Sequence, residues 1–290
     1  MQIREIYNYL KDALVNYPSL VHASNFITKD SSNLSEKERK VLDEMVRVYY
    51  KYLYVNLTTS GNGPKQVAHR VEEVNNYYNF IHTHGYDNFF SAQGKFRPTI
   101  LEEFCYLLFK DLVADINIQY SPEKIESGSA KAYTNLYFSA SNLKEFVTAP
   151  DIGVNEKDQD FAIFKTLDLM IAGKPQTIKL PVIAVECKTY IDKTMLEGSI
   201  ATAEKIKSGN PYSMFFIVTE NYDVSLDVDP AYSRIDQIYV LRKCTRKSMK
   251  TNWKDIDFSV VLDFVNQVKN HLTRNWSDVE FKMTNEGKII

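Results

Sequence analysis

Apolar residues in the first third of the chain recur at the three- and four-residue spacing that is typical of amphipathic helices. The first such pattern starts at Ile3 and stops at Tyr17-Pro18, because a proline disfavours a helical residue before it. A second pattern follows Ser35 and Glu38, which have the residue types and the spacing of a capping box. We therefore expect a helix on each side of a break near Pro18.

Two further helices are expected before about residue 120. The Gly-Asn-Gly-Pro sequence at residues 61–64 breaks the chain, and Pro64 suits the first turn of a new helix. Another helix is expected after Arg97-Pro98, where Thr99 and Glu102 match a second capping box. The pattern predicts a helical region over residues 1–95 and a second domain over residues 96–290.

The pattern changes to short apolar runs after about Tyr120, and these indicate strands. Ser127-Gly128-Ser129 resembles a loop, and helices are expected over residues 192–207 and 260–272. The expected strands are residues 136–138, 160–164, 182–188, 214–218 and 238–241. Strands that alternate with helices in this way predict an α/β fold, a mixed β-sheet flanked by helices.

The strand at residues 182–188 carries two charges in an otherwise apolar sequence. Side chains alternate across a strand, so Glu186 and Lys188 share one face and Cys187 lies on the other. Buried charges without a partner are costly, so the pair needs an ion partner, a metal or a cleft. Such a Glu-x-Lys suits phosphodiester hydrolysis, with Glu186 holding a divalent cation and Lys188 orienting or deprotonating the attacking water.

A magnesium site needs more than one carboxylate, because Mg²⁺ prefers several oxygen ligands. We expect the second acid to be Asp160, which opens the apolar strand at residues 161–164. Asp151 follows Pro150, but residues 152–155 after it resemble a turn. Asp168 is a weaker third candidate. The sequence spacing to Glu186 does not separate these acids.

The simplest interpretation of Glu186 and Lys188 is an ion pair on an edge strand, since such tripeptides are common. Three features favour a nuclease site instead: the apolar approach to Glu186, the Asp160 strand upstream, and the helix and buried strand downstream. Ionisable groups placed in apolar surroundings are often functional.

Residues 185–195 closely resemble the active-site segment of the BbvCI/DdeI group of type II restriction endonucleases, in the PD-(D/E)xK superfamily. In this group a Glu-x-Lys-Thr leads into a helix that begins Leu/Ile-Asp-Lys-Thr-Met, as Glu186 to Met195 do here. Residues 157–163 resemble the segment that carries the upstream acid. The resemblance covers about residues 97–218. It implies Mg²⁺-dependent cleavage of double-stranded DNA that leaves 5′-phosphate and 3′-hydroxyl ends.

Other residues are expected to assist catalysis or to contact DNA. Many enzymes that this chain resembles add a helical glutamate to the site, which would be Glu102 or Glu103, although Glu102 could equally cap its helix. The helix start at Lys193 and Thr194 could receive a phosphate. Residues 241–254 hold no acid, and a basic run of this kind suits phosphate contacts or a solvated surface. The DNA-binding candidates in it are Arg242, Lys243, Arg246 and Lys247.

The composition restricts how the protein could bind DNA and where it is expected to be found, but it does not indicate a function. The 290 residues carry a net charge of -2, so DNA binding would depend on local basic patches. Cys105, Cys187 and Cys244 lack zinc-ligand spacing, and together with the absence of a signal peptide they favour a cytoplasmic protein. No apolar run has the length of a membrane span.

The sequence therefore predicts a restriction enzyme that cuts a short duplex site, which by resemblance contains CTNAG or a relative of it. The alternatives are a PD-(D/E)xK nuclease of repair or of a mobile element, and a DNA-binding subunit that does not cut. One catalytic set per chain implies a homodimer, or a heterodimer with a related subunit.

Overall fold

The computed structural model describes residues 2–90, 96–225, 227–277 and 279–287. The N-terminal part consists of α1 (Ile3–Asn16), α2 (Val21–Asp30), α3 (Glu36–Thr58) and α4 (Pro64–Thr83). The capping box at Ser35 and Glu38 is confirmed, since Ser35 Oγ accepts from the Glu38 amide and the Glu38 carboxylate accepts from the Ser35 amide. Helix α2 has no counterpart among the helices that the sequence predicts.

The next helix, α5 (Pro98–Gln119), begins without the predicted cap. Pro98 lies in its first turn and Arg97 precedes it with no side-chain cap, so the capping box at Thr99 and Glu102 is wrong. Proline lacks an N–H and is preorganised for the first turn, so the helix starts before Thr99. The Thr99 hydroxyl donates instead to the Phe96 carbonyl at 2.7 Å.

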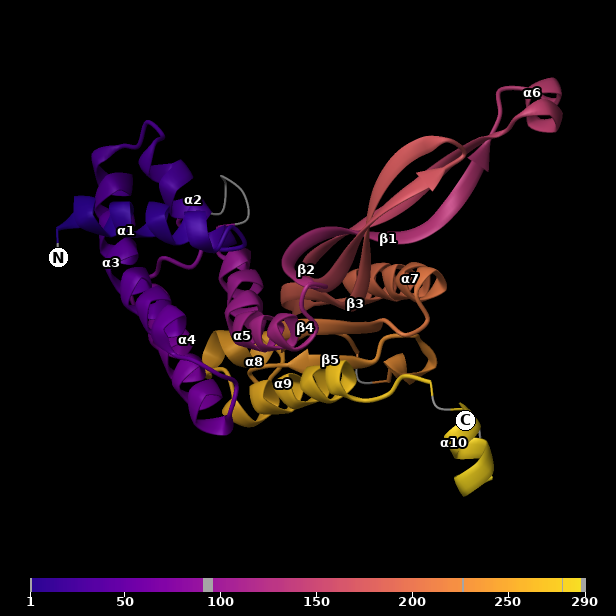
Figure 1. Ribbon diagram of the computed structural model, residues 1–290. Helices are drawn as coiled ribbons and strands as arrows, with labels where there is room; N and C mark the ends of the chain where they lie inside the picture. Colours follow the sequence, from indigo (N-terminus) through magenta and orange to yellow (C-terminus); the bar gives the residue numbers. More distant parts are fainter. Residues whose placement is uncertain (1, 91–95, 226, 278, 288–290) are drawn as a thin grey trace.

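The described residues form a five-stranded mixed sheet in the order β1-β2-β3-β4-β5. The first three strands are antiparallel neighbours, and β3, β4 and β5 are parallel. One face packs on α7 (Lys193–Gly209), and the other packs on α5 and α9 (Phe258–Thr273) (Figure 1). The predicted α/β fold, a mixed sheet flanked by helices, is confirmed. The strands are β1 (Glu126–Ser139), β2 (Asp151–Ile171), β3 (Lys174–Ile191), β4 (Met214–Tyr222) and β5 (Gln237–Val240).

The first three strands are much longer than the sequence predicted. Residues 152–155 pair with β1 and are not a turn, and residues 127–129 belong to β1 and are not a loop. A two-residue turn at Ala172 and Gly173 joins β2 to β3, and both residues have positive φ, which matches the right-handed twist of a hairpin. The outer halves of these strands project from the body as an arm that carries α6 (Leu143–Thr148) at its tip (Figure 1).

One hydrophobic cluster joins the N-terminal helices to the sheet. It includes Leu10 of α1, Tyr49 of α3, Phe109 of α5, Phe161 of β2 and Phe264 of α9. The expected boundary between residues 95 and 96 adjoins residues 91–95, which lie outside the described residues. Short helices follow β5 and α9, namely α8 (Arg246–Thr251) and α10 (Val279–Phe281). In the described part of the chain, no helix combines the length and the apolarity that crossing a membrane requires.

Candidate active site

The β2–β3 hairpin places an acid from each strand side by side. Phe161 and Val185 are the last pair of the ladder, and Asp160 and Glu186 are the next residue on each strand. Lys188 lies two residues beyond Glu186 on the same face of β3, because side chains alternate along a strand. The sequence reasoning placed these three residues on two strands, and the hairpin brings them together.

The ammonium group of Lys188 lies between the two carboxylates. Its Nζ atom is 3.7 Å from Asp160 Oδ2 and 3.6 Å from Glu186 Oε2. The three side chains keep limited access to solvent, with exposed fractions of 22% for Asp160, 14% for Glu186 and 29% for Lys188. The three side chains are therefore neither fully buried nor fully exposed, as expected at the edge of a cleft.

Each carboxylate is also fixed by a hydrogen bond. The Cys187 amide donates to Asp160 Oδ2 at 2.8 Å. This bond lies just beyond the last backbone pair between β2 and β3. Ser199 Oγ of α7 donates to Glu186 Oε2 at 2.5 Å. The second oxygens of the two carboxylates, Asp160 Oδ1 and Glu186 Oε1, take no part in these contacts.

Burial disfavours the charged form of Lys188, but Asp160 and Glu186 outweigh that effect and raise its pKa above the usual value. The side chain is therefore an ammonium ion at neutral pH. It places a fixed positive charge beside the two acids, where a phosphate could approach.

The donor set fits a magnesium ion that is completed by substrate. Mg²⁺ is usually held by one or two carboxylates together with phosphate oxygens and water. Asp160 and Glu186 provide two hard oxygen donors on one face of the sheet. Among the described residues, no group of three or more His, Cys, Asp and Glu side chains is close enough to hold a metal by itself. The phosphate and water ligands would thus be essential.

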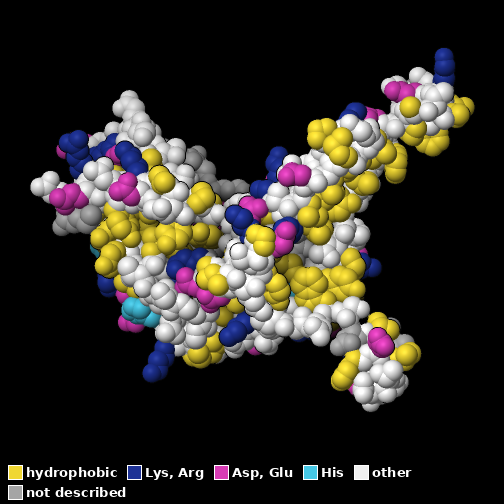
Figure 2. All heavy atoms as spheres, in the orientation of Figure 1, with side chains coloured by type: hydrophobic (Ala, Val, Ile, Leu, Met, Phe, Trp, Pro, Cys, Tyr) yellow, Lys and Arg dark blue, Asp and Glu magenta, His cyan; other side chains and the backbone are white. Residues whose placement is uncertain are grey.

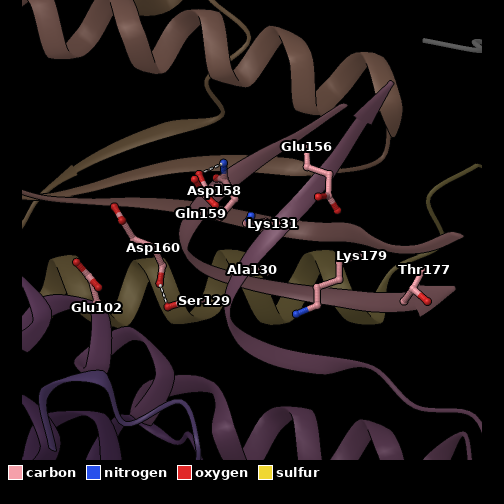
Figure 3. Close-up of a pocket in the computed structure, with 10 residues that line it drawn as sticks. All are labelled: Glu102, Ser129, Ala130, Lys131, Glu156, Asp158, Gln159, Asp160, Thr177 and Lys179. Carbon is pink, nitrogen blue, oxygen red and sulfur yellow. Dashed lines mark hydrogen bonds between the residues drawn. The ribbon is translucent and has the colours of Figure 1, made fainter. Parts of the chain in front are cut away.

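A pocket of about 510 Å³ opens beside Asp160, and Glu102 of α5 lines it (Figure 3). The Glu102 and Asp160 carboxylates lie near each other at one end of this pocket, and Ser129 Oγ donates to the Asp160 carbonyl at 3.1 Å. Among the charged residues of the lining, Glu156 and Asp158 bring the acids to four, against two lysines, Lys131 and Lys179.

Glu103 has a different position and a structural task. It is fully buried, and its Oε2 accepts from the His22 and Ala23 amides in the first turn of α2 at 2.9 and 3.0 Å. Tyr49 donates to its other oxygen at 2.7 Å. Burial raises the pKa of Glu103 to about 7 despite these three donors. Of the two neighbouring glutamates, Glu102 is the one that faces the pocket.

The two alternative acids lie away from this cluster. Asp151 is nine residues before Asp160 in β2, which corresponds to about 30 Å of extended strand. Its carboxylate is 62% exposed and forms an ion pair with Lys174 at 2.8 Å. Asp168 accepts from Thr177 on the exposed outer hairpin at 2.6 Å.

Cys187 points away from the acids, into the core. Its Sγ atom is 3.7 Å from Cys105 Sγ of α5, and both thiols are buried. The contact with Cys105 and burial raise the pKa of Cys187 well above the usual value. The thiol therefore stays neutral and serves packing.

The basic run after β5 does not form one surface. The expectation that Arg242 contacts DNA is corrected by its burial, since only 1% of it is exposed. Backbone pairing with β4 continues past β5, because the Arg242 amide donates to the Glu220 carbonyl, and this turns the side chain inward. There it pairs with the buried Glu220 carboxylate at 2.9 Å, which Arg97, just before α5, also contacts at 2.6 Å.

The remaining DNA-binding candidates are accessible. Lys193 and Thr194 are exposed in the first turn of α7, which Asp192 caps by accepting from the Met195 amide at 2.9 Å. Lys243 and Lys247 are exposed, and Arg246 is half-buried. Lys243 also pairs with Asp257 at 2.9 Å.

Sequence reasoning missed Ser199, which holds Glu186. A signal existed, since Ser199 interrupts the apolar face of α7 that Leu196, Ala203 and Ile206 form. A buried hydroxyl needs a hydrogen-bond partner, and the acid on the facing strand was available.

Comparisons with known proteins identify a family and a similar fold. A model of the Bpu10I restriction endonuclease family matches residues 93–284, which is more than half of the chain. A solved structure described as "native BbvCI A2B2 tetramer at low resolution" is similar in fold, with a TM-score of 0.64 and 18% sequence identity. The match covers 89% of this chain and 98% of that chain. No curated protein matches.

Proposed function

This chain belongs to the Bpu10I restriction endonuclease family, and from that membership we propose that it cuts duplex DNA at a short specific site in a Mg²⁺-dependent reaction. The single observation that supports this mechanism best is the Lys188 ammonium between Asp160 and Glu186, at 3.7 and 3.6 Å. A site related to CTNAG is the sequence-based expectation for the target.

Each residue of the cluster has a proposed task. Asp160 and Glu186 would hold Mg²⁺, which when bound lowers the pKa of a water ligand and offsets charge on the phosphate. Lys188 orients the attacking water and stabilises negative charge on the scissile phosphate. Ser199 and the Cys187 amide keep the two acids in place, and Glu102 assists from the pocket wall.

Other parts of the chain are proposed to bind the duplex. The exposed residues Lys193 and Thr194 lie at the N-terminus of α7, where backbone amides and the helix dipole favour an anion. Lys243, Arg246 and Lys247 would contact phosphates, and the helical region of residues 1–95 would make further contacts with the DNA.

The experiment that tests this function is incubation of the purified protein with a plasmid of mixed sequence and Mg²⁺. We expect discrete fragments, whose sequenced ends would give the site. A smear would indicate a general nuclease of repair or of a mobile element. An unchanged plasmid would support a binding subunit that does not cut.

Cleavage is expected to require Mg²⁺ or Mn²⁺ and to be poorly supported by Ca²⁺. Ca²⁺ is larger and tolerates irregular coordination, so it fills such oxygen sites without the same activation of water. Rates on one plasmid should be compared with each ion and with excess EDTA. Undiminished cleavage in EDTA would refute the metal mechanism.

The working enzyme is expected to contain at least two chains, because one catalytic set attacks one strand at a time. The similar BbvCI structure is described as an A2B2 tetramer, which makes a heteromeric assembly a second possibility here. Wild type mixed with excess Lys188→Ala protein should give nicked circles from supercoiled plasmid if subunits of a homodimer exchange. A chain that is half of a heterodimer should give little double-strand cleavage alone. Efficient linearisation by a protein that stays monomeric on DNA would contradict both.

A further inference from the structure

A second pocket, of about 600 Å³, lies where β3 continues beyond Lys188. Thr189 and Tyr190, the two residues after Lys188 in β3, line it, as do Arg246 and Lys250 of α8. It therefore opens at the carboxyl ends of β3 and β4, where Asn221 of β4 also lines it.

The two pockets differ in charge. The first contains four acids and two lysines. Arg97, Arg246 and Lys250 line the second together with one carboxylate, Asp87, and because Arg97 is already paired with the buried Glu220, the other two cations are the ones that could meet an anion. Asp87 is itself paired with Arg97 and with His82, each at 3.2 Å. The first pocket thus suits a cation, and the second suits an anion.

The best-placed cation in the second pocket is Arg246. Its guanidinium carbon is 3.6 Å from the centre of the Tyr190 ring, so the guanidinium forms a cation–π contact with the face of the ring. The only ion pair formed by Arg246 among the described residues is with Asp223 at 3.7 Å, which is too long for a hydrogen bond. The Arg246 guanidinium donates no hydrogen bond within the described part of the chain, and its planar set of N–H donors matches the geometry of a phosphate.

The position of Tyr190 ties this group to the active site. Ile191, the residue after Tyr190, is buried in the cluster against α7, so Tyr190 points to the other face of β3, toward the second pocket that it lines. Tyr190 is two residues from Lys188, about 7 Å along β3, which is about twice the 3.4 Å rise per nucleotide along the axis of a DNA duplex.

Several side-chain contacts hold the opposite wall of the pocket together. The His82 ring stacks on Trp253 at 3.8 Å and 9°, and the buried Arg242 lies over Trp253 at 4.4 Å. Trp253 Nε1 also donates to Asn79 of α4. A ligand would meet a preformed site, which lowers the entropic cost of binding.

Helix α5 connects the two pockets. Arg97 and Pro98 at its start line the second pocket, and Glu102 lines the first. From Pro98 to Glu102 the helix rises about 6 Å, so both pockets border one short path past Lys188. A nucleic acid strand that lies on this path would meet both.

We infer that the second pocket binds a backbone phosphate of the cleaved DNA strand, one or two nucleotides from the scissile phosphate. Arg246, supported by Tyr190, is the principal ligand, and Lys250 is a second cation. This inference rests on the proposed function, because it places the phosphate relative to Lys188.

The test measures binding of the full-length protein to two fluorescent duplexes in Ca²⁺ over a series of salt concentrations. One duplex has mixed sequence, and the other contains the site mapped from plasmid fragments. Arg246→Ala is expected to weaken binding to both by a similar factor, about tenfold. It should also lower the slope of log affinity against log salt by about 1, because one phosphate contact is lost.

Matched variants test the contact between Arg246 and Tyr190. Tyr190→Leu should reproduce part of the Arg246→Ala effect, because the guanidinium loses its support, whereas Tyr190→Phe should bind like wild type. Arg234→Ala is the control, since Arg234 is also half-exposed and paired with an acid but lies before β5, at the opposite end of the strands. It should change neither the affinity nor the slope.

The outcomes separate this inference from the proposed function. Wild type that binds DNA but never cleaves would contradict the function, while the salt slope on mixed-sequence duplex would still decide the pocket. Loss of affinity for the mapped site alone would show a base contact and overturn the phosphate assignment. An unchanged slope in folded Arg246→Ala, with the wild-type melting temperature, would also overturn it.

Discussion

Asp160→Ala, Glu186→Ala and Lys188→Ala are each expected to lower the rate of DNA cleavage by about a thousandfold or more. The two acids would lose a metal ligand, and Lys188 would lose the charge that faces the phosphate. All three side chains reach solvent at the edge of a cleft, so the free energy of unfolding should change little. Single-turnover cleavage of plasmid and urea unfolding would measure the two effects separately.

Asp151→Ala is the matched control. It removes an exposed carboxylate from the same strand and should leave the cleavage rate close to that of wild type. If Asp151→Ala inactivates the enzyme and Asp160→Ala does not, our assignment of the upstream acid is wrong.

Glu220→Ala should destabilise the protein by about 3–5 kcal/mol, because it leaves two guanidinium groups without their buried partner. Arg97 and Arg242 contact Glu220 from both sides, and neither Glu220 nor Arg242 is accessible to solvent. Urea unfolding would measure the loss. Glu204→Ala removes an exposed pair with Arg234 and should cost about 1 kcal/mol or less.

The same triad predicts a pH dependence. Burial would raise the pKa of Glu220, but Arg97 and Arg242 outweigh it and hold the pKa below the usual value. A carboxylate whose pKa is lower in the folded state than in the unfolded state stabilises the fold at pH values above the unfolded pKa of about 4.3. This contribution is lost as the pH falls below that value. Wild type should therefore lose more stability below pH 4 than Glu220→Gln does. Equal losses would show that Glu220 is not the group responsible.

The active-site strand was predictable because its signal is local. Alternation alone assigned Glu186 and Lys188 to one face and Cys187 to the other, and a charged pair in an apolar run is rare enough to notice. The helix at Lys193 also follows from its own residues, since Asp192 caps it.

Features that depend on distant partners were missed. Arg242 looked like part of a basic surface, and only the buried Glu220 of β4 explains why it turns inward. The Thr99 and Glu102 pair had the capping pattern, but Pro98 moved the start of the helix. The outer parts of β1 to β3 pair mostly with one another, and their polar, exposed sequences lack the alternation by which a half-buried strand is recognised.

The cluster that joins the N-terminal helices to the sheet bears on how this enzyme could be divided or recombined. A cassette cut at the start of the family match, residue 93, would keep α5 but lose the helices whose side chains cover it. It would also lose the buried Asn75, which exchanges two hydrogen bonds with the Ile256 backbone. When relatives are recombined, residues that contact each other across this boundary should therefore come from the same parent. Without the N-terminal helices, the catalytic part would expose apolar side chains that are buried in the whole chain.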